Sequence, residues 1–208
     1  KWSEIKIQNV DSAEKLFSQA KNCGIKKSIL ISSMSSFKNT RSTFGKAKQA
    51  IENHAINYGG ICIRPGVVWG KNLKGFMGTL NKVAALPIVP IIGHQADIYT
   101  CLDRDLGILC YKIIETLKPE SIYYSANPTP IKFSFLIKTL AKAHNDKPII
   151  IPVPWQPIYY SLKLLEIIFK KPIVFRSDSI IGLLAANPNP NFSSTNKLDL
   201  KQQIFGDI

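Results

Sequence analysis

The sequence predicts an α/β fold in which helices cover a parallel sheet. Over the first 125 residues, short apolar runs alternate with helical patterns of roughly 10–15 residues, which is the order of parallel strands joined by helices. The runs at 28–33, 61–63 and 122–125 have the length and apolar character of buried strands. The pattern changes from residue 126, so we expect two units, residues 1–125 and residues 126–208.

The first helix is predicted to begin at Asp11 and to end at Gly24. Asp11 and Glu14 have the spacing of a capping box, and four apolar residues then share one helical face: Ala13, Leu16, Phe17 and Ala20. Ser28–Ser33 is expected to be a short buried strand, because its centre is apolar and free of Gly and Pro. Met34–Ser42 is polar and is expected to be a loop.

The alternation continues with a helix at Thr43–Asn57, which Gly59-Gly60 closes. Ile61–Ile63 follows as a buried strand, which Pro65-Gly66 is expected to end in a sharp turn with exposed backbone amides. Leu86–Pro90 is expected to be an extended connection. The other expected elements are helices at 74–85, 103–117, 133–144 and 158–169, strands at 122–125 and 149–153, and a turn-rich segment at 187–190.

The charge of the chain restricts its partners. Lys and Arg number 27 against 14 Asp and Glu, a net charge of +13. Such an excess suits a nucleotide, a nucleotide sugar or an acidic membrane surface, and it also suits a merely solubilising surface. A dedicated nucleic-acid-binding protein is disfavoured, because no Lys/Arg run exceeds two residues and no Arg-rich arm is present.

The cysteines and histidines do not have the spacing of a metal site. Cys23, Cys62, Cys101 and Cys110 form no Cys-x-x-Cys motif, and the three histidines are far apart in the sequence. We therefore expect no metal, and reduced, mostly buried cysteines in a cytoplasmic protein. The longest apolar runs are much shorter than the roughly 20 residues that span a bilayer.

Three motifs carry the candidate chemistry. Ser32-Ser33 ends a predicted strand, where open α/β sheets bind ligands. Phe44 and Lys48 are i and i+4 on the next helix and so share one face. Arg64-Pro65-Gly66-Val67-Val68-Trp69-Gly70 directly follows the next strand. Taken singly, the serine motif is more often an ordinary turn and the Phe44/Lys48 motif is more often part of a solvated helix. The third motif is as often an ordinary turn.

In this order and spacing, the three motifs resemble those of extended short-chain dehydrogenase/reductases. More narrowly, they resemble the NAD-dependent epimerase/dehydratase family, which acts on nucleotide sugars. Further stretches agree with the same family over nearly all of the chain: Asn9–Ala13, Leu86–Gly93 and Leu102–Leu106. The resemblance implies a Rossmann-type, doubly wound parallel sheet followed by a small C-terminal substrate-binding subdomain.

The sequence departs from the family pattern in two places. The glycine-rich turn that cradles the dinucleotide pyrophosphate is not found, so the chain is interpreted as the C-terminal two-thirds of a longer protein, without the N-terminal half of the Rossmann domain. Phe44 stands where the family has a catalytic tyrosine. Loss of that phenol removes an acid–base group worth roughly 10²–10⁴-fold in rate, so any family chemistry is expected to be impaired.

The resemblance also implies individual roles. Lys48 would bind the nicotinamide ribose of NAD or NADP, Ser33 would lie near the cofactor, and Ser35 would polarise the substrate. Ser35 is chosen for this role over Met34, because Met34 cannot donate a hydrogen bond. Asn9 would brace the loop that follows the Ser32-Ser33 strand end, which we call the serine loop. Pro65 and Val67 would pack against the nicotinamide, and Arg176 would bind the substrate diphosphate.

The function that the resemblance implies is an NAD(P)-dependent nucleotide-sugar epimerase, dehydratase or reductase, with a homodimer as one expected assembly. The alternative is a non-catalytic nucleotide-binding or scaffolding member of the same superfamily, which Phe44 favours. For Arg176, a surface ion pair is an equal alternative. A more distant hypothesis is a membrane-surface protein that uses the apolar helix at 158–169 and the basic charge.

Overall fold

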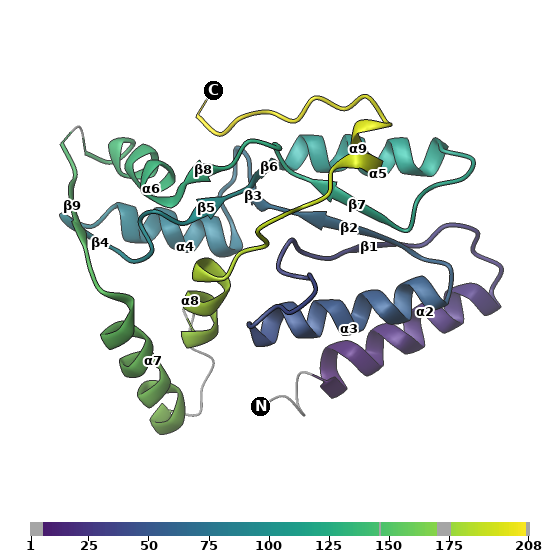
Figure 1. Ribbon diagram of the computed structural model, residues 1–208, viewed down its shortest axis with the longest axis horizontal. Coiled ribbons are helices and arrows are strands. Elements are labelled where there is room, and N and C mark those ends of the chain that lie inside the picture. Colours follow the sequence, from purple (N-terminus) through teal and green to yellow (C-terminus); the bar gives the residue numbers. More distant parts are fainter. Residues whose placement is uncertain (1–5, 146, 170–175, 207–208) are drawn as a thin grey trace.

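The computed structural model describes residues 6–145, 147–169 and 176–206. They form a parallel sheet with helices on both faces, and a second group of helices and short strands beside it (Figure 1). In chain order the elements are η1 (Lys6–Asp11), α2 (Ser12–Asn22), β1 (Ile29–Ile31), α3 (Thr43–Asn57), β2 (Ile61–Pro65), β3 (Val67–Trp69), α4 (Gly75–Ala84), β4 (Ile88–Ile91), β5 (Asp97–Ile98), β6 (Thr100–Leu102), α5 (Asp103–Glu115), β7 (Ile122–Ser125), β8 (Ile131–Lys132), α6 (Phe133–Lys142), β9 (Ile149–Pro152), α7 (Trp155–Phe169), α8 (Ser177–Leu184) and α9 (Ser193–Asn196).

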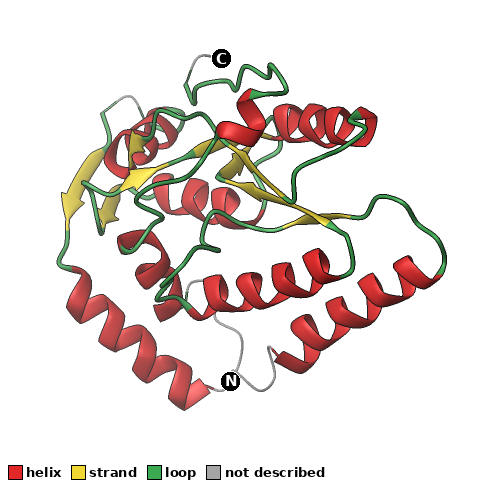
Figure 2. Ribbon diagram, turned by 45° about the vertical axis from the view of Figure 1, so that its right-hand side comes forward, coloured by secondary structure: helices red, strands yellow, loops and turns green. Residues whose placement is uncertain are grey.

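The main sheet has the strand order β1-β2-β7, and all three strands are parallel. Helices α2 and α3 lie on one face and α5 lies on the other, as Figure 2 shows. The alternation along β2 serves both faces: Cys62 packs with Phe17 of α2, whereas Ile63 packs with Leu109 and Ile113 of α5. This arrangement confirms the predicted α/β fold with a doubly wound parallel sheet.

Strand β1 is less buried than the sequence suggests. Its three residues were expected to be interior, but Ile29 and Leu30 are half-buried and Ile31 is 42% exposed. Within the described residues, β1 pairs with β2 on one side and has no neighbour on the other. An apolar run can therefore form an edge strand here, because its length and composition do not reveal how many neighbours it has.

The second group of elements, which we call the second unit, has a core of its own, the second core. Met77 of α4, Val89 of β4, Leu136 of α6 and Ile180 of α8 are nearly or fully inaccessible within one cluster. Strands β4 and β9 pair in parallel across this unit. Its core therefore combines residues from both sides of position 125.

Two local expectations at the ends of elements are wrong. Asp11 does not cap α2 with its side chain, because its own backbone is helical and continues from η1 into α2. Pro65-Gly66 is not a sharp turn with free amides. The Gly66 amide donates to the Ser125 carbonyl (3.0 Å) and the Val67 amide donates to that of Tyr99 (2.7 Å), so the chain passes directly from β2 into β3.

Other differences are smaller. Part of the expected connection at 86–90 forms strand β4, in which Pro90 is exposed, and the helix expected to begin at residue 158 begins at Trp155. Cys62 and Cys101 are buried and Cys110 is half-buried, as expected, but Cys23 is exposed, and all four are free thiols. No helix among the described residues has both the length and the apolar character needed to cross a membrane.

Candidate functional site

The candidate site lies at the carboxyl ends of β1 and β2. Beyond β1 the chain continues alongside β2, with hydrogen bonds from the Ser32 amide to the Ile63 carbonyl (2.7 Å) and from the Met34 amide to the Pro65 carbonyl (3.0 Å). These bonds bring two residues predicted to contact the cofactor, Ser33 and Pro65, to the same edge of the sheet. This edge is where open parallel sheets bind their ligands.

The serine loop is anchored by Met34. Its side chain is buried against Tyr124 and Ala126, so it is not available to a ligand at the sheet edge. Ser33 and Ser35 are half-buried, and the Ser33 hydroxyl accepts a hydrogen bond from the Ser35 amide (3.1 Å). The burial of Met34 agrees with the choice of Ser35 as the polar group of this loop, and the role of Ser35 itself stays a prediction.

Ser32 belongs to the predicted Ser32-Ser33 motif, but no role of its own was assigned to it from the sequence. Its side chain is 6% exposed, and its hydroxyl oxygen has no hydrogen-bond partner among the described residues. A buried hydroxyl without a partner costs free energy, and such groups in native structures often mark the place of a ligand or a water molecule. Its position at the end of a predicted strand was the signal for it in the sequence.

Helix α3 brings Phe44 and Lys48 to the same site. The Lys48 ammonium lies 5.8 Å from the centroid of the Phe44 ring and donates a hydrogen bond to the Ile31 carbonyl at the end of β1 (3.2 Å). Burial lowers the pKa of Lys48, and the negative charge of Glu52 partly opposes this shift. The predicted i and i+4 relation therefore places an ammonium group between an aromatic ring and the end of a strand.

The start of α3 is packed tightly against the serine loop. The Ser42 hydroxyl caps the helix by accepting from the Gly45 amide (3.0 Å). A Cβ atom at Gly45 would lie 2.3 Å from the Ser35 carbonyl oxygen and 2.4 Å from the Thr40 hydroxyl oxygen. Only glycine allows this approach, and the approach fixes the distance between the serine loop and Phe44.

A buried ion pair between Glu52 and Arg64 adjoins the site, and no role was predicted for it from the sequence. The Glu52 carboxylate accepts hydrogen bonds from Arg64 Nε (2.9 Å) and Nη2 (2.6 Å), and from the Ser36 hydroxyl (2.7 Å). Arg64 Nη1 donates in turn to the Tyr124 hydroxyl (2.7 Å). Glu52 is one more i+4 step along the face of Phe44 and Lys48, and this spacing was the signal for it in the sequence.

Helix α8 joins the second unit to the start of α3. The Asp178 carboxylate accepts hydrogen bonds from the amides of Thr43 (2.7 Å) and Phe44 (3.0 Å). These are two of the amides that a helix leaves unpaired at its N-terminus. Two residues earlier, Arg176 is exposed, and its Nε lies 3.9 Å from a carboxylate oxygen of Glu166. This long surface ion pair leaves most of the guanidinium accessible.

Two further residues were predicted from the sequence to belong to the site, Val67 and Asn9. Val67 begins β3, directly after Gly66, and is half-buried beside the second core. Asn9 is exposed on η1 and makes no hydrogen bond with the described residues of the loop it was expected to brace. Elsewhere in the part of the chain that the structure describes, no three His, Cys, Asp or Glu side chains lie close enough to share a metal ion.

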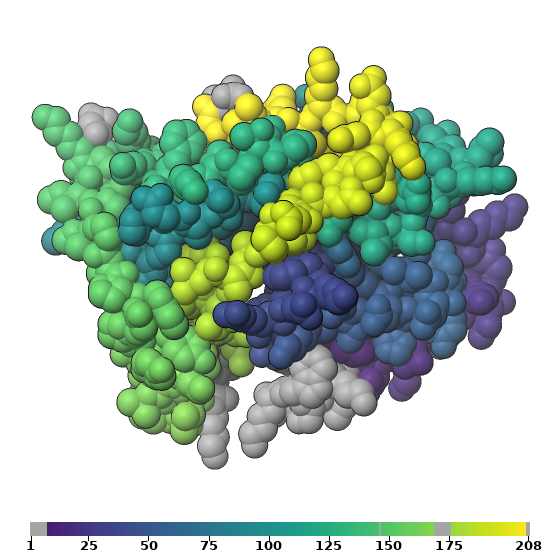
Figure 3. Space-filling view, in the orientation of Figure 1, coloured from purple at the N-terminus to yellow at the C-terminus, as the bar shows by residue number. Residues whose placement is uncertain are grey.

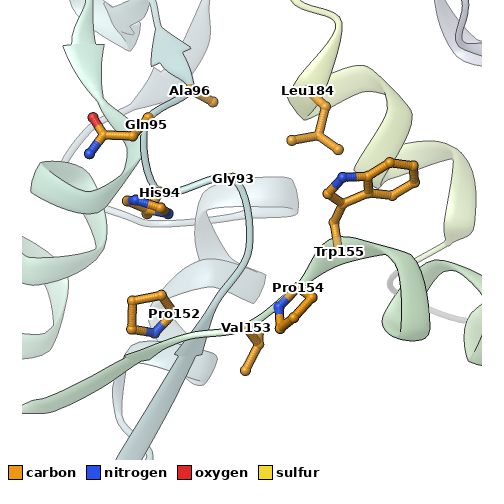
Figure 4. Close-up of a pocket in the computed structure, with 9 residues that line it drawn as sticks. All are labelled: Gly93, His94, Gln95, Ala96, Pro152, Val153, Pro154, Trp155 and Leu184. Carbon is orange, nitrogen blue, oxygen red and sulfur yellow. The ribbon is translucent and has the colours of Figure 1, made fainter.

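Two clefts open at the other end of α8. The larger one, of about 580 Å³, is shown in Figure 4, and Trp155, Pro154, His94 and Leu184 form part of its wall. The second, of about 290 Å³, lies beside Tyr99 and Asn187, and shares Gln95, Ala96 and Leu184 with the first. Neither cleft is lined by a residue predicted from the sequence. Leu184 and Asp178 lie near opposite ends of α8, so the helix connects the clefts with the start of α3.

Comparison with solved structures defines the class of fold. The chain superposes on gox2253 with a TM-score of 0.68 and 13% identity, over 97% of this chain and 69% of that one. It superposes on TunA, an NAD-dependent NDP-hexosamine 5,6-dehydratase of tunicamycin biosynthesis, with a TM-score of 0.59 and 14% identity, over 70% and 56% of the two chains. For a dTDP-4-dehydrorhamnose reductase from Bacillus anthracis in complex with NADP, the values are 0.61 and 16%, over 74% and 62%.

The chain thus has a Rossmann-type fold, and the fold implied by the sequence resemblance is confirmed. It spans little more than half the length of TunA. No protein-family model and no curated protein sequence matches the chain.

Proposed function

We propose that this chain forms the nicotinamide side and the substrate side of an NAD(P)-dependent protein that acts on a nucleotide sugar. The observation that carries the proposal is the position of Lys48, whose ammonium lies between the Phe44 ring and the carboxyl end of β1. Solved structures with this fold include a dehydratase and a reductase that use NAD and NADP, respectively.

The residues present fit one half of a dinucleotide. Lys48 donates one hydrogen bond to Ile31, and an ammonium has two further N–H groups with which to bind ribose hydroxyls. The Ser32 hydroxyl, which has no partner among the described residues, and the half-buried Ser33 lie at the same sheet edge. We assign the packing of a nicotinamide ring to Pro65, which is buried in this structure, and to Val67, which is half-buried. When bound, NAD(P) would accept and return a hydride. We assign its pyrophosphate to residues outside this chain.

The site offers poor candidates for the group that would transfer a proton in the reaction. Phe44 is 51% exposed, and its ring, which carries no hydroxyl, lies 5.8 Å from the Lys48 ammonium. Ser35 is the nearby polar group assigned to the substrate, and a serine hydroxyl is a poor acid. We therefore propose slow epimerase, dehydratase or reductase chemistry. Phe44 specifically favours the second candidate, a nucleotide-binding protein without turnover.

For the substrate, the proposal rests on Arg176. Its side chain is exposed, and among the described residues its one ion pair is the long contact with Glu166, which suits an arginine that pairs with a diphosphate. The net charge of +13 agrees with an anionic nucleotide sugar. A cytoplasmic location and assembly as a homodimer belong to the same proposal.

The test compares this chain with a longer form that supplies a glycine-rich N-terminal segment. Isothermal titration calorimetry with NADH and NADPH should show much tighter binding to the longer form, and equally tight binding by both would place the pyrophosphate site within this chain. The Phe44→Tyr variant of the longer form then separates the two candidates. Turnover of UDP-, GDP- and dTDP-sugars should rise by roughly 10²-fold or more if the rest of the site is catalytic. Cofactor binding without turnover in either form would establish the non-catalytic candidate.

A further inference from the structure

Helix α7 has apolar side chains on two opposite sides. On the inner side, Ile158, Tyr159 and Leu162 pack against the second core. On the outer side, four large apolar side chains remain 58–67% exposed: Tyr160, Leu164, Ile167 and Ile168. Their spacing of three and four residues forms one stripe along the helix. We call these four residues the outer stripe of α7.

A second exposed apolar surface lies next to α7 in the chain. Strands β4 and β9 pair with the register Ile88↔Ile149 and Pro90↔Ile151, and all four of these side chains are exposed. The alternate residue of β4, Val89, is completely buried. Figure 1 places β4, β9 and α7 along the same side of the molecule, and Figure 3 shows α7 protruding there as part of the surface.

Exposed apolar surface of this kind is unusual for a protein without a partner, because burying each such side chain is worth about 1.5–3 kcal/mol. The charges around the stripe indicate what covers it. Glu166 is the one acidic residue of α7, and it is turned inward, where it accepts hydrogen bonds from the Ser177 amide (2.8 Å) and hydroxyl (3.0 Å). Lys163 is exposed beside the stripe, with its ammonium 5.5 Å from the Tyr159 ring.

The outward-facing side of α7 therefore combines apolar side chains with positive charge and no exposed acidic group. Lys147, two residues before β9, is also exposed, and the whole chain carries +13. An apolar stripe with a lysine beside it and a tyrosine among its members, on a strongly basic chain, has the composition of a helix that lies in the plane of an anionic membrane surface. The 15 residues of α7 are about 22 Å long, which is too short to span the bilayer.

We propose that the outer stripe of α7 binds the surface of a membrane that contains anionic lipids, with the helix parallel to the bilayer. The stripe inserts among the acyl chains near the headgroups, and Lys163 remains at the level of the phosphates. The proposal goes beyond the cofactor and substrate site, because none of its residues belongs to that site.

The test is co-sedimentation of the purified chain with two kinds of vesicle, phosphatidylcholine alone and phosphatidylcholine mixed with phosphatidylglycerol. We expect binding to the mixed vesicles that weakens as salt is raised, and much weaker binding to phosphatidylcholine alone. The Leu164→Gln/Ile167→Gln variant should lower the partition coefficient by about tenfold or more. The matched control is Ile114→Gln/Leu117→Gln, at the end of α5, where the same two residue types are also exposed, Leu117 by 95%. This control should bind like the unmodified chain.

Three results would overturn the proposal. The first is the absence of binding to either kind of vesicle by the unmodified chain. The second is an equal loss of binding in the α7 and α5 variants, with far-ultraviolet circular dichroism showing that both remain folded. The third is a dimer in light scattering that the α7 variant converts to a monomer, since the stripe would then be an interface between two copies of the chain.

Discussion

The carboxylate of Asp178 accepts a hydrogen bond from the backbone amide of Phe44 at 3.0 Å, across 134 positions of sequence. The same carboxylate binds the Thr43 amide, so one side chain of α8 satisfies two donors at the start of α3. A negative charge at a helix N-terminus is also favoured by the helix dipole. Asp178 thereby connects the second unit to the element that carries Phe44 and Lys48.

Asp178→Ala should destabilise the fold by about 0.5–2 kcal/mol, the range for a lost helix N-cap. The matched control is Asp97→Ala, which removes an ion pair with Lys132 in which both side chains are about half exposed. Exposed pairs contribute roughly 0–1 kcal/mol, so this variant should change little. Urea unfolding of both variants measures the difference. Equal losses would mean that the contact between α8 and α3 contributes no more than a surface pair.

Gly45→Ala should destabilise the fold by about 1–3 kcal/mol, because the new methyl group would overlap the Ser35 carbonyl and the Thr40 hydroxyl. Gly107→Ala is the opposite case. Gly107 lies within α5, and a Cβ atom there would have no atom within 4 Å apart from its chain neighbours and the backbone of its own helix. This change should stabilise the chain by up to about 1 kcal/mol through helix propensity. Thermal midpoints of the two variants should therefore move in opposite directions.

The sequence predicted best those features that depend on neighbouring residues. Helix α3 has the predicted bounds, and α5 begins at the predicted Asp103, because apolar periodicity is a local signal. The exposure of Ile31 and the pairing of β4 with β9 depend on which distant strand lies alongside, and periodicity does not contain that information.

In the candidate site, too, the features set by local spacing were predicted and the contacts between distant elements were not. The shared face of Phe44 and Lys48 followed from a spacing of four residues, and the structure places them together. The contacts of Glu52 with Arg64, and of Asp178 with Phe44, join elements that are separate in sequence, so spacing along one helix could not predict them. The Pro65-Gly66 error has the same origin, because the amides that a local reading left free are bound by Ser125 and Tyr99.

Glu52→Gln should destabilise the fold by about 3–5 kcal/mol, because it leaves the Arg64 guanidinium without its countercharge in a largely buried position. The double variant Glu52→Gln/Arg64→Met removes both charges and should lose less than the two single changes combined. A double-mutant cycle by denaturant unfolding gives the coupling. Additive losses would show that the two side chains contribute independently, despite their two short hydrogen bonds.

Lys48→Ala should weaken NAD(P)H binding to the longer form by about 1–3 kcal/mol, the range for a charged hydrogen-bonding group lost from a site. Lys46→Ala is the control. Lys46 is exposed two positions away on α3, whereas Lys48 is half-buried and reaches the end of β1. Calorimetry of the two variants distinguishes a cofactor-binding ammonium from a general effect of charge, since the latter would weaken both equally.

Burial raises the pKa of both the Cys62 and Cys101 thiols to about 12, from 9.0 in the unfolded chain. The unfolded chain therefore loses these protons at lower pH, and the contribution of the thiols to stability is complete below pH 9 and is lost as pH rises toward 12. In urea unfolding over this range, Cys62→Ala/Cys101→Ala should show a shallower loss of stability with pH than the unmodified chain. Identical slopes would contradict the burial of the two thiols.

The free edge of β1 affects how this chain behaves at high concentration. Among the described residues no strand pairs with its outer edge, where the Ile31 carbonyl accepts only from the Lys48 side chain and the Ile31 side chain is apolar and exposed. An edge of this kind is a template on which a strand from another molecule can pair, which leads to aggregation. A segment that adds a strand beside β1 would cover this edge and prevent pairing between molecules. Its presence would therefore determine how much of the protein remains in solution after refolding.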